Sequence, residues 1–360
     1  MHPPSGAALP PFLVRSRRQD SYDEAFAARR PAPLSSNAPA ASEIAHAWAQ
    51  VGAALSPHPD CPLPNWAGGG DTLHQHLLVI GAGHDTEMID QLRHLETAAA
   101  RFGKIGFVGP TEARRLVEWS MGERIVVLSR MPRNVSDWDL RCPLAALART
   151  LGPQAAHAHA GRPFLRVTAT AARHWRDRLA AAAQHGFCVG LAGWEAFDDA
   201  GTGRTDSSPH VSRPSSLSSL APLLRVPGVS WVPLGCPGDD ASSAMPPQSV
   251  DWIDWRADCD DLADEASLID NLDLVIALDS AHGHLADGLG VPVWRLDAAR
   301  ITASQREGGG DTPFSPQRRA TIDALSRFPL PCVADDWPGA VGAAADVLLA
   351  MATEFQGWTR

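Results

Sequence analysis

The chain has 360 residues, enough for two domains of ordinary size that each bury a core. It carries 31 Lys and Arg residues against 41 Asp and Glu residues, and this net charge of −10 argues against nucleic acid as a partner. No stretch approaches the roughly 20 consecutive apolar residues of a membrane span, and the N-terminus has no signal-peptide core. These features predict a cytoplasmic protein without an integral membrane segment.

The beginning of the chain differs in composition from the rest. Residues 1–42 are rich in Pro, Ala, Ser and Arg and show no apolar periodicity, so we predict a disordered N-terminal segment. A short helix is expected to follow in "SEIAHAWAQVGAAL". The six cysteines lie far apart without a CxxC pair, which argues against a zinc ribbon or a redox motif.

Strands and helices are predicted to alternate from "HQHLLVIGAG" onward. This strand is followed by the helical run "DTEMIDQLRHLETAAARFG", the strand "KIGFVGP", the helix "TEARRLVEWSMG" and the strand "RIVVLSR". Strands that alternate with helices predict a parallel sheet.

A second series of buried runs follows the periodic helix "ATAARHWRDRLAAAAQHG", which we interpret as a bridge between two halves. These runs are "FCVGLAG", "VSWVPLG", "LDLVIALD" and "VPVWRLD", and a C-terminal helix is predicted in "WPGAVGAAADVLLAMATEF". The polar loop over residues 200–219 is long for an α/β connection, so it is either disordered or a lid that faces a ligand.

The stretch "ALDSAHGHLADGLGVPVW" carries the clearest candidate site. Asp279 ends a buried strand and Ser280 fits the N-cap of a short helix, whose first N–H groups would open at the carboxyl edge of the sheet. A phosphate is the natural ligand there, and His284 could add a donor. His282 and His284 are two residues apart and splay by roughly 200° on a helix, which disfavours a metal site that uses both.

A purely structural interpretation of the same stretch stays open. In it, Ser280 only caps the helix, Asp279 bonds neighbouring amides and His284 is a satisfied, half-buried side chain.

The stretch "LIDNLDLVIALDSAHGHLADGLGVPVW" resembles the C-terminal signature of bacterial glycosyltransferases of the heptosyltransferase-like class, especially those fused to tetratricopeptide repeats. Asp279, Ser280, His284 and Trp294 fall in register with that signature. Further similar motifs occur in the same order as in the family, namely "CPLPNWAG", "WDLRCPLAAL", "RPSSLSSLAPLLRVPGVSWVPL" and "DTPFSP".

The resemblance implies an α/β fold of the GT-B type, in which two Rossmann-like parallel-sheet domains face a cleft and the C-terminal helix returns to the first domain. The implied boundaries are an N-terminal, acceptor-side domain over 43–165, a bridging helix over 166–184, a C-terminal, nucleotide-sugar-side domain over 185–337 and a last helix over 338–360. The repeat array of the family is missing from this sequence, so the N-terminal segment is a possible contact for a protein partner.

The resemblance also implies an activity, which is transfer of a hexosyl or heptosyl group from a nucleotide sugar to a glycan or protein acceptor. No cofactor and no metal are expected, because helix N-termini and basic side chains would neutralise the diphosphate. Asp85 stands at the place of the family's general base. The implied donor-binding residues are Asp279, Ser280, Ala281, His284 and Arg213.

Several departures from the family pattern favour an alternative, a catalytically degenerate GT-B domain that binds a nucleotide or a protein. Ala82 and His84 replace the two glycines of the family's loop, and Arg141 and Ala146 replace a histidine and a serine. The family's W-A-G has become Gly193-Trp194-Glu195. Asp85 would then only cap the following helix, and Arg213 would be a solvated loop residue. A weaker alternative is a small metal site at either His157 with His159 or His74 with His76.

Overall fold

The computed structural model describes residues 61–81, 86–153, 162–194, 217–235, 249–278, 280–297, 300–303 and 337–358. All of them belong to one compact unit of the chain. The N-terminal segment over 1–42, the helix expected after it and most of the loop over 200–219 lie outside the described residues.

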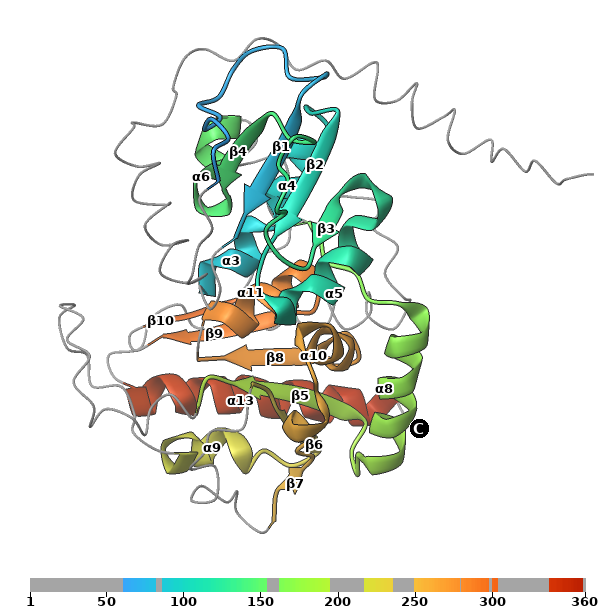
Figure 1. Ribbon diagram of the computed structural model, residues 1–360. Helices are drawn as coiled ribbons and strands as arrows, with labels where there is room; N and C mark the ends of the chain where they lie inside the picture. Colours follow the sequence, from blue (N-terminus) through green and yellow to red (C-terminus); the bar gives the residue numbers. More distant parts are fainter. Residues whose placement is uncertain are drawn as a thin grey trace, which may run out of the picture. The chain divides into compact units, whose positions relative to one another are not determined.

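The first sheet has four parallel strands in the order β3-β2-β1-β4 (Figure 1). The three strands expected from "HQHLLVIGAG", "KIGFVGP" and "RIVVLSR" are confirmed, and a fourth comes from the "WDLRCPLAAL" motif. Its alternation is too short to indicate a strand, and it forms because its backbone pairs with β1. The strands are β1 (His76–Ile80), β2 (Lys104–Val108), β3 (Val126–Leu128) and β4 (Leu140–Pro143).

The long helix expected after β1 is divided into α3 (Thr86–Gln91) and α4 (Arg93–Ala99). At this division, Nε of Arg93 donates to the carbonyl oxygen of Asp90 at 3.0 Å. Among the described residues of this half, the other helices are α5 (Thr111–Met121) and α6 (Leu144–Leu151), with a 3-10 turn, η1 (Gly122–Arg124), after α5.

Helix α8 (Ala169–Ala182) precedes the second sheet and confirms the helix expected there. Thr168 starts it, because its side-chain oxygen accepts from the amide of Ala171 at 3.2 Å, as a helix N-cap does.

The second sheet has six strands in the order β10-β9-β8-β5-β6-β7, of which β10 alone runs antiparallel to its neighbour. The four predicted buried runs are its four central strands. The two edge strands are short and were not predicted. The strands are β5 (Phe187–Ala192), β6 (Val229–Pro233), β7 (Asp251–Trp252), β8 (Leu274–Ala277), β9 (Val293–Asp297) and β10 (Arg300–Ala303).

Two helices of this half matter for the site. They are α10 (Leu262–Ile269) and α11 (Ser280–Leu289), which come directly before and after β8. The remaining short elements are η3 (Leu217–Leu220), α9 (Ala221–Leu224) and η4 (Arg256–Asp258).

The C-terminal helix is present as α13 (Trp337–Trp358), but its buried face packs on the second sheet (Figure 1). It contacts β5, β10 and α9, and Phe355 stacks on Phe187 of β5 with ring centroids 4.5 Å apart. The expectation that this helix packs back on the first domain is therefore corrected. The reason is its apolar stripe, which completes the second sheet's core with Val341, Ala344, Leu348 and Met351.

The apolar core of the described residues is continuous between the two halves. One cluster includes residues of β1, α3 and α5 from the first half and of α10, α11 and β9 from the second half. A separate cluster lies between the second sheet and α13, and a small third cluster lies on the other face of the first sheet. The expected α/β architecture with two parallel-stranded units is thus confirmed.

Candidate functional site

The candidate site begins where β1 and β8 end, because the loops with the predicted site residues follow these two strands. The backbone ladder runs one residue past each strand, with Gly81 N–H donating to Val108 at 2.7 Å and Leu278 N–H donating to Ala192 at 2.9 Å. The next segments lead directly into α3 and α11. Both helices therefore start at the carboxyl edge of their sheet, where ligands bind in open α/β proteins.

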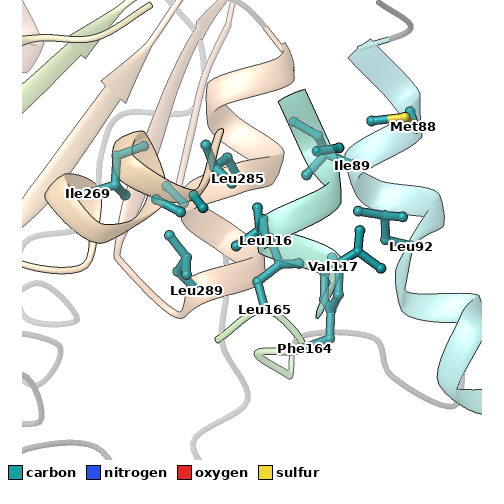
Figure 2. Packing of buried hydrophobic residues seen from close by; sticks show 14 of the residues in the cluster. Met88, Ile89, Leu92, Leu116, Val117, Phe164, Leu165, Ile269, Leu285 and Leu289 are labelled. Carbon is teal, nitrogen blue, oxygen red and sulfur yellow. The ribbon is translucent and has the colours of Figure 1, made fainter. Parts of the chain in front are cut away.

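Helices α3 and α11 pack directly on each other. Figure 2 shows the apolar side chains of this contact, with Met88, Ile89 and Leu92 on one side and Leu285 and Leu289 of α11 on the other. We call this contact the α3–α11 seam.

The segment between α6 and α8 also joins the seam. The amides of Phe164 and Leu165 both donate to the carbonyl oxygen of Gly288 on α11, at 2.8 and 2.9 Å. A Cβ at Gly288 would lie 2.7 Å from Leu165, so this glycine permits the close approach of the segment.

His284 and Asp90 meet across the seam. His284 Nδ1 lies 3.5 Å from Asp90 Oδ1, and the His284 side chain is 23% exposed. Each residue is four positions after the first residue of its helix, about 6 Å along the axis. The starts of α3 and α11 are thus each within about one turn of this shared contact.

Arginines flank the pair on both sides. Arg93 forms an ion pair with Asp90, and its guanidinium carbon lies 4.9 Å from the centre of the Phe164 ring. On the other side, Arg295 of β9 forms an ion pair with Asp287 of α11. All four of these charged groups act on the His284 imidazole.

Burial is the main influence on the His284 imidazole, and it lowers its pKa below the ordinary value of 6.5. The carboxylates of Asp90 and Asp287 act in the opposite direction, whereas Arg295 and Arg93 lower the pKa further. The net direction is downward, so the ring is neutral near pH 7.

His282 contacts a different element from His284. Its Nε2 lies 3.1 Å from Oε1 of Glu265 on α10, and the same oxygen accepts from the Gly235 amide at 2.7 Å. Gly235 directly follows Leu234 at the end of β6, so Glu265 ties this strand end to the first turn of α11. The two histidines therefore face different partners, as their spacing predicts.

Helices α5 and α10 form a second contact between the halves, which we call the α5–α10 contact. Its edge carries ion pairs. Arg115 of α5 lies 2.7 Å from Asp261 and 2.6 Å from Asp264. Asp261 also caps α10, because its carboxylate accepts from the amides of Ala263 and Asp264 at 2.8 and 3.1 Å.

The sequence-predicted site residues are only partly described. Asp85, Arg213 and Asp279 lie outside the described residues. Ser280 is the first residue of α11, although its side chain lies outside them, and Ala281 packs at the edge of the shared core. Of the predicted set, the structure thus places His284 in full and brings it to Asp90.

Sequence reasoning missed the partners of these residues. Asp90, Arg93, Glu265 and Arg295 belong to no site motif, and Asp287 lies inside the signature stretch without an expected role. The charges on α3 become relevant to the site only because α3 packs on α11. The i,i+3 spacing of Asp90 and Arg93 was the one local signal, and it indicates only a helix-surface ion pair.

Two of the residues that depart from the family pattern lie in the described part of the chain. Arg141 of β4 donates from Nε to Asn65 at 3.1 Å, and Ala146 is buried in α6. Ala82, His84 and Glu195 lie outside the described residues.

The described residues contain no group of three or more His, Cys, Asp or Glu side chains that could hold a metal ion. At the predicted pair, His74 and His76, the Nδ1 of His76 instead lies 2.9 Å from the carbonyl oxygen of Asp137. His157 and His159 lie outside the described residues. In the part of the chain that the structure covers, no helix is long and apolar enough to cross a membrane.

Comparison with known proteins gives structural neighbours only. No protein-family model and no curated protein matches the sequence. Among solved structures, the chain is similar to the dodecameric, iron-containing heptosyltransferase TibC in complex with ADP-D-beta-D-heptose. The identity is 10%, 80% of this chain and 78% of the other are covered, and the TM-score is 0.47.

Two further structures overlap over less of this chain. A glycosyl transferase family 9 protein from Veillonella parvula is 12% identical, with 61% of this chain and 80% of the other covered at a TM-score of 0.41. The E. coli ADP-heptose lps heptosyltransferase II is 16% identical, with 61% and 83% covered at a TM-score of 0.40. All three scores are below 0.5, and the description of the fold given above rests on this chain's own strand order.

Proposed function

We propose that the protein is a glycosyltransferase that moves a sugar from a nucleoside diphosphate to a hydroxyl or amide acceptor on a glycan or a protein. The observation that carries this proposal is the α3–α11 seam. It brings together α3 and α11. Asp85 precedes α3 in the sequence, and Asp279 precedes α11, whose first residue is Ser280.

The diphosphate would be held at the start of α11. The backbone amides of Ser280 and Ala281 point toward the N-terminal end of the helix, where the helix dipole favours an anion. The Ser280 hydroxyl and the Arg213 guanidinium would add hydrogen bonds and positive charge to the leaving group. The transfer would require no metal, because these groups supply the neutralisation.

Asp85 is the general base that the motif predicts. It directly precedes Thr86, the first residue of α3, in the segment of the sequence that joins β1 to α3. A carboxylate there could accept the proton of the acceptor hydroxyl as that oxygen attacks the anomeric carbon.

Activity assays with a panel of UDP-, ADP- and GDP-sugars test this proposal. Wild-type protein should hydrolyse or transfer at least one donor in the presence of EDTA, and Asp85→Ala should reduce kcat by roughly 10² to 10⁴. Asp346→Ala, which removes an exposed carboxylate on α13, is the matched control. Equal rates for Asp85→Ala and Asp346→Ala would exclude Asp85 as the base, and loss of activity in EDTA would contradict the metal-free reaction.

The Arg141–Asn65 bond favours a second candidate, a degenerate domain that binds a nucleotide or a protein without catalysis. A side chain at a motif position is used here for structure, because it ties β4 to the segment before β1. Nucleotide titration separates the two candidates. Binding of UDP, ADP or GDP that weakens about tenfold in Ser280→Ala, without turnover of any donor, would support the degenerate domain.

A further inference from the structure

Glu265 of α10 joins three elements of the second half. The residue is 8% exposed, and its Oε1 accepts from the amide of Gly235 at 2.7 Å and lies 3.1 Å from Nε2 of His282. A carboxylate offers about four lone-pair directions on its two oxygens, so a single oxygen can accept both bonds. The end of β6, the helix α10 and the first turn of α11 therefore meet at this side chain.

These elements meet where the connections of the second sheet change direction. From β5 the chain continues to β6 and β7 on one side, whereas β8 and β9 lie on the other side. The ends of β6, β5 and β8 are side by side, because Leu234 and Leu278 both donate from their amides to carbonyl oxygens of β5 at 2.9 Å. Open α/β sheets bind ligands outside the carboxyl ends of the strands at such a point. The strand order thus indicates a ligand next to His282, independently of the helix start.

The imidazole of His282 is held between Gly235 and Glu265. A Cβ at Gly235 would lie 3.4 Å from Cε1 of the ring, so this glycine, with a φ of +103°, permits the close approach of the strand end. Side chains on a helix lean toward its N-terminus, and His282 is the third residue of α11. The side chain is 17% exposed. The ring is therefore fixed by its neighbours and still accessible in part, close to the start of the helix.

Anions on both sides would give this ring a defined role. An imidazolium has an N–H on each nitrogen, so it can donate to Glu265 and to a phosphate oxygen together. The carboxylate and the phosphate both stabilise this charged form, and two charge-assisted bonds outweigh the opposing end of the helix dipole. Among the described charged groups on neighbouring elements, Arg295 of β9 lies against Gly283, and Asp90 of α3 meets His284.

We infer that His282 is a further diphosphate-binding residue at the start of α11 and that Glu265 is the positioning residue that holds it. The inference rests on the diphosphate site of the proposed function. Both residues lie outside the set that the resemblance implies for the nucleotide sugar, and they add to that set without replacing any member of it.

Isothermal titration of the full chain with UDP, ADP and GDP tests the contact, and uridine, adenosine and guanosine serve as ligands without the diphosphate. His282→Ala should weaken binding of the nucleoside diphosphate about tenfold to hundredfold, because a charge-assisted hydrogen bond is lost. Nucleoside binding should change less than about threefold. An unchanged diphosphate affinity would overturn the inference, as would an equal loss for the nucleoside.

The matched control for this variant is His185→Ala. His185 is an exposed histidine just before β5, and its two bonds to Ser230 come from its backbone, so the variant keeps them. Its affinity for the nucleoside diphosphates should equal that of wild type. A loss as large as that of His282→Ala would contradict a specific contact at the start of α11.

Glu265→Gln tests the positioning. The amide oxygen can still accept from Gly235, but the charge that holds the ring is lost, so diphosphate affinity should fall about threefold to tenfold. The double variant His282→Ala/Glu265→Gln should bind no more weakly than His282→Ala, because Glu265 acts through the ring. Losses that add in the double variant would contradict the positioning role. The double variant also leaves no buried carboxylate without its partner, so its own loss tests the contact even where His282→Ala does not fold.

The control for the lost carboxylate is Asp264→Asn on the same helix. Asp264 pairs with Arg115 of the first half, and its variant should keep diphosphate affinity within about threefold. With an active nucleotide sugar, Glu265→Gln should raise the KM for that substrate and keep kcat within about threefold, a division that a general loss of structure would not produce. A lower kcat at an unchanged KM would overturn the assignment of Glu265.

Binding and turnover separate this inference from the proposed function. Turnover of a nucleotide sugar, with a diphosphate affinity that His282→Ala does not change, would overturn the inference and leave the proposed function in place. Diphosphate binding that weakens in His282→Ala, without turnover of any nucleotide sugar, would support the contact and contradict the transferase. If UDP, ADP and GDP all fail to bind, the inference is overturned, and the turnover assay alone decides the proposed function.

Discussion

The two contacts between the halves differ in their charged groups. In the α5–α10 contact, Arg115 meets Asp261 and Asp264. Burial lowers the pKa of the Arg115 guanidinium, but its bonds to the two carboxylates outweigh burial and raise that pKa above its ordinary value. In the α3–α11 seam, the half-buried imidazole of His284 meets Asp90, and burial lowers the pKa of this ring below its ordinary value of 6.5. The first contact therefore contains an arginine that keeps its charge, whereas the second contains a ring whose charge depends on pH.

The largest expected effect comes from the apolar core beneath both contacts. Leu116 of α5 is fully buried in the shared cluster (Figure 2), and Leu116→Ala should lower the free energy of unfolding by about 2 to 5 kcal/mol. Chemical denaturation measures the loss. Leu349→Ala, at a site on α13 that is 42% exposed, is the matched control and should change stability by less than about 0.5 kcal/mol. A small effect of Leu116→Ala would mean that the halves are not joined by this core.

The next effect distinguishes the seam from an ordinary helix surface. Alanine favours helix over glycine, yet Gly288→Ala should destabilise by about 1 to 3 kcal/mol, because the new Cβ would overlap Leu165. Gly342→Ala on α13 has no atom within 4 Å of its Cβ and should stabilise by about 0.5 to 1 kcal/mol. Thermal midpoints of the two variants should therefore move in opposite directions. Two shifts of the same sign would contradict the close packing at Gly288.

A smaller effect is expected at the rim of the α5–α10 contact. Arg115→Gln should cost no more than about 1 kcal/mol, since the Arg115 side chain is 39% exposed and water screens its two ion pairs. The cost should shrink in 1 M salt, and kcat should not change. Denaturation at low and high salt measures this. A change in kcat would show that this contact also takes part in the chemistry.

The smallest effect is the pH dependence of the seam. The pKa of His284 is lower in the folded protein than its ordinary value of 6.5, so the unfolded chain binds more protons below that pH. The contribution of this group is therefore fully present above pH 6.5 and is lost as the pH falls through the folded pKa. Denaturation midpoints at pH 7.5 and 5.5 should differ less in His284→Gln than in wild type. An equal difference in both proteins would contradict the lowered pKa.

Much of the architecture could be predicted from the sequence, since buried parallel strands such as β5 and β8 are long apolar runs with clear ends. Strands β4, β7 and β10 could not, because they are short and form by pairing with neighbours rather than by their own pattern. The destination of α13 was predicted wrongly, because an apolar stripe shows that a helix is buried but does not show against which sheet.

The candidate site was predictable only in part. The sequence indicates His284 through its motif and its place one turn into a helix. Asp90 could not be found in the same way, because its importance depends on the packing of two helices almost 200 residues apart in the chain. A contact of that kind leaves no local periodicity or spacing to detect.

The continuous apolar cluster determines how the protein unfolds. Residues of β1, α5, α10 and α11 belong to one core. Neither half can therefore unfold without exposing apolar surface on the other half. Heating should therefore give one cooperative calorimetric peak for both halves. If the chain is divided between Leu165 and α8, each fragment would expose the apolar surface that the other half covers in the intact protein, and it should aggregate.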